Sequence, residues 1–165
     1  MTKLLNSEKL TKADYEGLAE FRYALRKFLG FSEDAAKGHG VTPQQYQAIL
    51  AIEGFPGRNW VTLGELAEQM RIMHHSAVGM VDRLEALRLV KRTESEGDRR
   101  RVRVSLTKKG LRLLETLYRV HRAELRSCGG DLAASLHKAA QRIPAKSGAA
   151  QVFTSPPCFM PEVAD

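Results

Sequence analysis

The 165-residue chain has only two cysteines, Cys128 and Cys158, and neither has neighbours at zinc-ligand spacing. Two cysteines are too few for a disulfide framework, so we expect a protein of the reducing cytoplasm. No apolar run approaches the length that spans a bilayer, and the first residues, MTKLLNSEKLTK, lack the apolar core of an export signal. We therefore expect neither a membrane protein nor an exported one.

The residue groupings of common enzymes are also missing. We find no nucleophile with a matching base, no phosphate-binding glycine loop and no carboxylate pair. His74 and His75 are adjacent, but neighbouring side chains on a helix point about 100° apart, and no carboxylate or cysteine completes a ligand set. The sequence predicts no catalysis, no cofactor and no metal.

Positive charge is abundant and unevenly placed. The chain has 26 Lys and Arg against 19 Asp and Glu, a net charge of +7. Residues 58–110 hold 12 basic against 7 acidic side chains and residues 111–142 hold 6 against 3, whereas residues 1–57 hold 7 of each. Concentrated positive charge favours an anionic partner, with nucleic acid first and a membrane surface second.

The N-terminal third is expected to be helical. The chain's length and 43% hydrophobic content suit one folded domain. Apolar residues recur at helical spacing over residues 14–29, and residues 38–40, Gly-His-Gly, interrupt the pattern. Thr42 and Gln45 then form a capping box, with a proline at the first helical position, so a second helix is expected to reach about Glu53.

Two short helices joined by a tight turn follow. Thr62 and Glu65 form a second capping box, which predicts a helix that ends near Met70. The next helix is expected over residues 74–87, because apolar residues recur along one face. These residues are Ala77, Met80, Val81 and Leu84.

A hairpin comes next. Residues Leu89–Thr93 and Arg101–Leu106 are β-prone, and Glu94–Arg100 joins them. Two short helices followed by a hairpin form a winged helix-turn-helix, in which the second helix fits the major groove of B-DNA and the hairpin reaches along the duplex. The predicted fold class is therefore mainly α with a small β-hairpin wing.

The second short helix carries small and polar side chains opposite its apolar face. Such side chains allow a close approach to base edges, although an ordinary solvent-exposed face is the alternative. The candidate DNA-binding residues on this helix are His74, His75, Ser76, Gly79 and Arg83.

The hairpin has four arginines in the five positions 99–103. Arginines at a hairpin tip enter the minor groove or hold phosphates beside it, and a merely solubilising cluster is the alternative. We expect Asp98, Arg99 and Arg100 at the tip, with Arg99 and Arg100 as the candidates for groove insertion. Arg101 and Arg103 are expected along the exposed side of the returning strand.

Thr107 is expected to cap a long helix toward the C-terminus. Gly129-Gly130 should interrupt that helix, and a further short helix should follow, reaching Ile143. The expected apolar face of the long helix comprises Leu111, Leu114, Tyr118, His121 and Leu125.

Residues 14–128 resemble the MarR family of bacterial transcriptional regulators. The stretches VTPQQYQAILAIEG and AVGMVDRLEALRLVKR carry the resemblance. The wing adds a D-x-R motif at Asp98 and Arg100, with Thr107 nine residues after Asp98. The resemblance implies a homodimer with interlocked terminal helices on a pseudo-palindromic site, and repression that a small ligand or thiol oxidation relieves.

Three positions depart from the family pattern. Gly79 stands where many members have an arginine, and Met73 where a serine N-cap is usual. Arg88 replaces the glycine that ends the recognition helix and is expected to adopt a left-handed conformation. The implied effector pocket lies between the dimer helices and the winged helix, where the nearby aromatic residues are expected to be ordinary core. They are Phe21, Tyr23, Phe28 and Tyr46.

These observations predict a four-part organisation. Residues 1–57 hold a dimerisation helix and a supporting helix, 58–107 the winged helix, 108–143 the C-terminal dimerisation helices and 144–165 a flexible tail. The predicted function is a DNA-binding repressor whose partners are double-stranded DNA, a second copy of itself and a small-molecule effector. A winged-helix protein-interaction module and a redox sensor that uses Cys128 are the alternatives.

Overall fold

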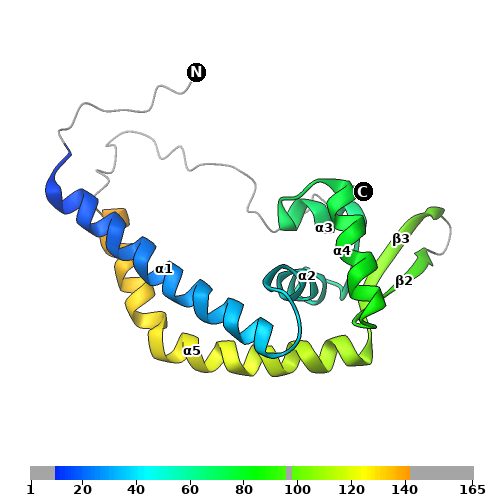
Figure 1. The fold of residues 1–165 in the computed structure, drawn as a ribbon. Coiled ribbons are helices and arrows are strands. Elements are labelled where there is room, and N and C mark those ends of the chain that lie inside the picture. The colour runs from blue at the N-terminus through cyan, green and yellow to red at the C-terminus, as the bar shows by residue number, and fades with distance from the viewer. Residues whose placement is uncertain (1–9, 96–97, 142–165) are drawn as a thin grey trace, which may run out of the picture. The chain divides into compact units, whose positions relative to one another are not determined.

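The structure, a computed structural model, describes residues 10–95 and 98–141 (Figure 1). It is mainly helical, with one three-stranded antiparallel sheet in the order β1-β3-β2, which confirms the expected fold class. The elements are α1 (Lys12–Gly38), α2 (Pro43–Glu53), β1 (Trp60–Thr62), α3 (Leu63–Met70), α4 (His74–Ala86), β2 (Val90–Ser95), β3 (Asp98–Leu106) and α5 (Lys108–Gln141).

The chain divides into two compact units. Ser32–His121 form one, and the described residues up to Phe31 form the other together with those from Arg122 onward. In the latter unit Lys138 Nζ lies 2.6 Å from Glu20 Oε2, so an ion pair joins α5 to α1. The first helix is longer than expected, because the helical pattern continues to Gly38.

Both predicted capping boxes are present. Thr42 N–H donates to Gln45 Oε1 at 2.9 Å, and Gln45 N–H donates back to Thr42 Oγ1 at 3.2 Å. Thr62 N–H donates to Glu65 Oε2 at 2.7 Å, and Glu65 N–H returns to Thr62 Oγ1 at 3.3 Å. Each box satisfies donors at a helix start that have no partner within the helix, so the starts of α2 and α3 are fixed locally.

The core of the Ser32–His121 unit is built from α2, α3, α4 and the inner face of the sheet. The predicted apolar face of α4 is buried as expected. Leu114 and Leu117 of α5 join this core, and His121 is buried with them. Leu111, Tyr118 and Leu125, which were expected on the same face, are exposed instead. The predicted face of α5 was therefore right for Leu114 and His121 but rotated by about 50° from the buried one, since successive residues of a helix lie about 100° apart.

The expected break at Gly129-Gly130 is also wrong. Helix α5 continues through both glycines to Gln141, and Ile143 lies outside the described residues. A glycine in a helix costs about 1 kcal/mol relative to alanine but keeps its backbone hydrogen bonds. In a helix of 34 residues this penalty is outweighed.

The joint between α4, the wing and α5 is tight. Arg88 adopts the expected left-handed conformation, with φ 59°, and Leu89 N–H donates to Leu84 O at 2.9 Å. Thr107 N–H donates to Leu89 O at 2.9 Å, and Thr107 Oγ1 caps α5 by accepting from Gly110 N–H at 3.1 Å. A Cβ on Gly110 would collide with Leu89 O, so no other residue fits there without movement of the backbone.

Replacement of Gly110 by alanine is expected to lower the free energy of unfolding by about 1–3 kcal/mol, because the added methyl group must displace the Leu89 carbonyl. Gly129→Ala is the matched control. A Cβ on Gly129 meets no other atom within 4 Å, so this variant should gain up to about 1 kcal/mol. Urea denaturation of both variants at one protein concentration measures the difference. Equal stability of the two would contradict the close approach.

Candidate nucleic-acid interface

Helix α4 presents its polar face as the sequence predicts. His74, His75 and Arg83 are exposed, and Ser76 and Gly79 are half-buried. Met73 precedes the helix and provides no side-chain cap, in agreement with the expected departure from the family pattern. A Cβ on Gly79 would lie 3.5 Å from Arg83 Nη1, an ordinary van der Waals distance, so the Arg83 guanidinium lies beside Gly79.

The wing hairpin is longer than predicted. Strands β2 and β3 leave only residues 96–97 between them, and these lie outside the described part of the chain. The expectation that Asp98, Arg99 and Arg100 form the tip is therefore wrong: they are the first residues of β3, and Arg101 follows them in the same strand. Asp98 pairs with Ser95, beyond an irregularity in β2, so strand pairing continues almost to the turn. The side chains of residues 95 and 98–101 lie outside the described structure.

An arginine also fastens the wing to helix α4. Arg92 of β2 places Nη2 at 2.6 Å from Asp82 Oδ1 and Nη1 at 2.5 Å from Glu85 Oε2, both on α4. Asp82 is exposed on α4, and its carboxylate is used in this contact. Burial lowers the pKa of Arg92, but its hydrogen bonds to the two carboxylates outweigh that effect and raise it. The orientation of α4 is thus tied to that of the hairpin.

Sequence reasoning missed strand β1 and the cluster of rings and guanidinium groups beside it. Arg58 lies 3.9 Å from the ring centroid of Trp60, and Arg103 lies 4.3 Å from the same centroid. Arg58 also pairs with Glu65. Burial raises the pKa of Glu65, but hydrogen bonds from Thr62 and Arg58 outweigh it and hold the pKa below its ordinary value. The β-prone triplet Trp-Val-Thr directly before the capping box was the available signal.

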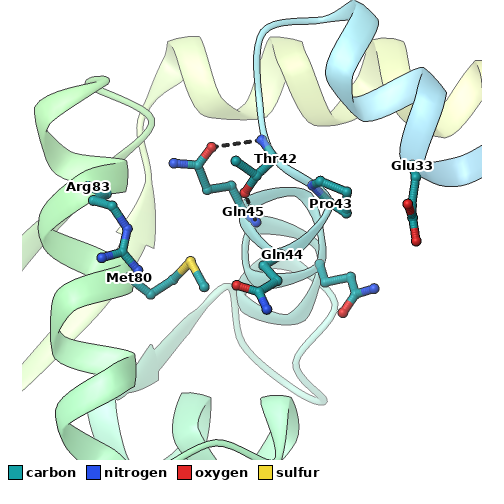
Figure 2. A pocket seen from close by; sticks show the side chains of 8 residues that line it. Glu33, Thr42, Pro43, Gln44, Gln45, Met80 and Arg83 are labelled. Carbon is teal, nitrogen blue, oxygen red and sulfur yellow. Dashed lines mark hydrogen bonds between the residues drawn. The ribbon is translucent and has the colours of Figure 1, made fainter.

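A cavity of about 580 Å³ lies beside α4 (Figure 2). Gln45 of α2, which accepts the capping hydrogen bond from Thr42 N–H, lines one side of the cavity. Met80 and Arg83 of α4 line the opposite side. Arg83 therefore belongs both to the cavity and to the polar face of α4. The lining residues are Glu33, Thr42, Pro43, Gln44, Gln45, Gln47, Met80 and Arg83.

None of the four aromatic residues considered for an effector pocket lines this cavity. Tyr46 is buried, as expected for a core residue, and its ring is stacked on His121 with centroids 4.6 Å apart. Tyr23 is 61% exposed, so the expectation that it is core is wrong for the single chain.

The structure gives little support to a redox role for Cys128 or to a metal site among the described residues. Cys128 is half-buried, and burial together with the Glu124 carboxylate raises the pKa of its thiol. A raised pKa reduces the thiolate that oxidation requires. Within residues 10–95 and 98–141, no three His, Cys, Asp or Glu side chains gather as metal ligands. No helix in the same ranges is long and apolar enough to cross a membrane.

Comparison with known proteins agrees with this geometry. Residues 39–101 match the model of the MarR family. Among curated proteins, none has a sequence that matches the chain. Among solved structures, AbsC, a MarR family transcriptional regulator from Streptomyces coelicolor, is 22% identical with a TM-score of 0.66, over 83% of this chain and 95% of AbsC.

Two further solved structures have a similar fold. MepR from S. aureus, solved as a complex with DNA, is 17% identical with a TM-score of 0.57, over 75% of this chain and 98% of MepR. NadR, solved with 4-hydroxyphenylacetate, is 21% identical with a TM-score of 0.59, over 81% of this chain and 90% of NadR. At these identities the likeness shows the winged-helix fold.

Substitution of Arg92 is expected to loosen the contact between α4 and the hairpin. Arg92→Ala should lower the free energy of unfolding by about 1 kcal/mol, since it removes a half-buried guanidinium that holds two carboxylates. Arg92→Lys should recover only part of this, because an ammonium cannot hold both carboxylates in one plane. Lys12→Ala, which breaks an exposed pair with Glu16, should change little. Urea denaturation checks all three, and equal effects of the Arg92→Ala and Lys12→Ala variants would contradict the assignment.

Proposed function

The winged-helix segment of this chain, residues 39–101, belongs to the MarR family, and from this premise we propose that the protein is a sequence-specific DNA-binding transcriptional regulator. It binds a pseudo-palindromic operator as a homodimer and represses by occupying it. The observation that carries the proposal is the polar, exposed start of α4 beside an arginine-rich hairpin in one compact unit. The complex of MepR with DNA supports it.

Helix α4 is the element that enters the major groove. His74, His75 and Ser76 lie in its first turn, the part of a recognition helix that contacts base edges. Gly79 has no side chain to hold the helix away from the bases, and Arg83 reaches a guanine edge or a phosphate one turn later. These residues read the sequence, while other contacts set the position of the protein on the duplex.

The start of β3 is the second contact with DNA. Arg99, Arg100 and Arg101 follow within a few residues of the hairpin turn, so they lie toward its far end even though they are paired in the strand. Arginines there bind phosphates or enter the adjacent minor groove, where the negative potential is enhanced. Their contribution is mostly electrostatic and therefore depends on salt.

Dimerisation is supported by apolar side chains that the terminal helices leave exposed. Such residues on one surface are typical of an interface with another protein. A two-fold dimer of winged helices places two half-sites about one helical turn, roughly 34–36 Å, apart. The large exposed apolar residues of the terminal-helix unit are Leu10, Tyr15, Leu18, Tyr23, Leu29, Leu125 and Leu136.

Release by a small ligand completes the proposal. NadR, which has the same fold, was solved with a small aromatic acid, and the cavity beside α4 has a volume within the range of small-molecule sites. A redox mechanism through Cys128 is disfavoured by the raised pKa of that thiol. The basic hairpin disfavours a protein-interaction module, for which acidic or apolar residues would be expected.

Selection of binding sites from random duplex DNA tests sequence reading. The wild-type protein should enrich an inverted repeat. His75→Ala and Ser76→Ala should shift the preferred bases within each half-site, since each good base contact is worth about 1–3 kcal/mol of discrimination. His39→Ala is the matched control, because His39 is exposed at the end of α1. An unchanged preference in both α4 variants would remove their role in reading bases, and no enrichment by the wild type would refute the proposed function.

Binding titrations at several salt concentrations test the wing. The double variant Arg99→Ala/Arg100→Ala should bind less tightly, and the slope of log K against log salt should flatten by about 0.9 for each phosphate that the variant no longer binds. Arg112→Ala/Arg119→Ala removes the same charge from exposed positions of α5 and serves as the control. Affinity and slope that match the wild type would overturn the assignment of the wing arginines.

A further inference from the structure

The sheet has one face against the helical core and one face turned away from it. Val61 pairs with Val104, which in turn pairs with Arg92, and both valines are fully buried. Neighbouring residues along a strand point to opposite faces, so the residues on either side of these three lie on the other face. This outer face consists of Trp60, Thr62, Lys91, Thr93, Arg103 and Ser105.

Arg103 is held flat on the outer face without a polar partner. Its guanidinium lies over the Trp60 ring, and among the described residues no carboxylate pairs with it and no atom accepts a hydrogen bond from its buried Nε. The charge of Arg58, on the same ring, is balanced by Glu65. Stacking uses the flat face of a guanidinium and leaves its edges free of the ring. Nε of Arg103 is buried, so in this half-buried side chain the terminal Nη groups are the donors for an anion.

The rest of the outer face suits the same anion. Lys91 is exposed in the neighbouring strand, directly across from Ser105, and Thr93 is directly across from Arg103. None of the described strand residues on this face is acidic. The neighbouring Glu65 carboxylate of α3 is bound by Thr62 and Arg58. Arginine, lysine, serine and threonine are the side chains that bind DNA phosphates.

We propose that the outer face of the sheet is an additional DNA contact, which binds the sugar–phosphate backbone of the duplex that flanks the operator. This inference rests on the proposed function. Arg92 ties α4 to the core side of the sheet, so the outer face is turned away from α4. With α4 in the major groove, any duplex that this face contacts therefore lies beyond the bases that α4 reads. The contact recognises phosphates and is independent of sequence.

Two duplexes test the contact with the full-length protein. One contains only the operator enriched from random DNA, and the other adds about one helical turn (roughly 10 base pairs) of unrelated sequence on each side. The wild type is expected to bind the flanked duplex several-fold more tightly. Its salt slope on that duplex should be steeper by about 0.9 for each additional phosphate that the protein binds.

Variants assign the tighter binding to this face. Lys91→Ala and Arg103→Met should bind the short duplex like the wild type and show little of the increase in affinity that the flanks provide. Arg119→Met, on exposed α5, is the matched control and should keep that increase. Lys91 is exposed and makes no described polar contact, so Lys91→Ala still tests the proposal if Arg103→Met fails to fold by circular dichroism.

Two results would overturn the inference: no increase in affinity from the flanks in the wild type, or a full increase in both variants. The second result would assign the contact with the flanks to other residues. Binding of neither duplex by the wild type would instead show that the proposed function fails, and the additional DNA contact would fail with it.

Discussion

The arrangement of the winged helix depends on the backbone at Leu89. Its N–H closes the end of α4 by donating to Leu84 O, and its carbonyl accepts from Thr107, the residue that caps α5. Gly110 lies against that carbonyl so closely that no side chain fits. The directions of α4, the wing and the first turn of α5 are therefore set within a few residues. The left-handed conformation of Arg88 is the strain that this turn requires.

Arginine has two separate uses in the winged helix. Arg58 and Arg92 are structural, because each is compensated by carboxylates and fastens one element to another. Others, such as Arg83 and Arg103, have no such carboxylate among the described residues and are available to an anion. The net charge of residues 58–110 is thus a poor measure of the charge offered to DNA. What counts is which guanidinium groups remain uncompensated, and this depends on contacts between elements.

The sequence predicted those features that are fixed by neighbouring residues. The starts of α2 and α3 follow from capping boxes, and the buried face of α4 follows from its apolar period. Strand β1 was missed because its three residues become a strand only by pairing with β3, some forty positions later. The hairpin turn was placed too late for a similar reason, since strand pairing extends beyond the alternating valines. The break predicted at Gly129-Gly130 was wrong because the low helix propensity of glycine was considered without the length of the surrounding helix.

Under the proposed function, the position of Arg83 indicates how a small ligand would compete with DNA for one side chain. Its guanidinium stands on the polar face of α4 and at the wall of the cavity that α2 closes from the other side (Figure 2). A carboxylate bound in this cavity would use the same Arg83 donors that a phosphate or a guanine edge needs. The cavity lies wholly within Ser32–His121, so such competition requires no rearrangement between the two units. Binding of such a ligand and of DNA would then be coupled, because the two cannot both satisfy one side chain.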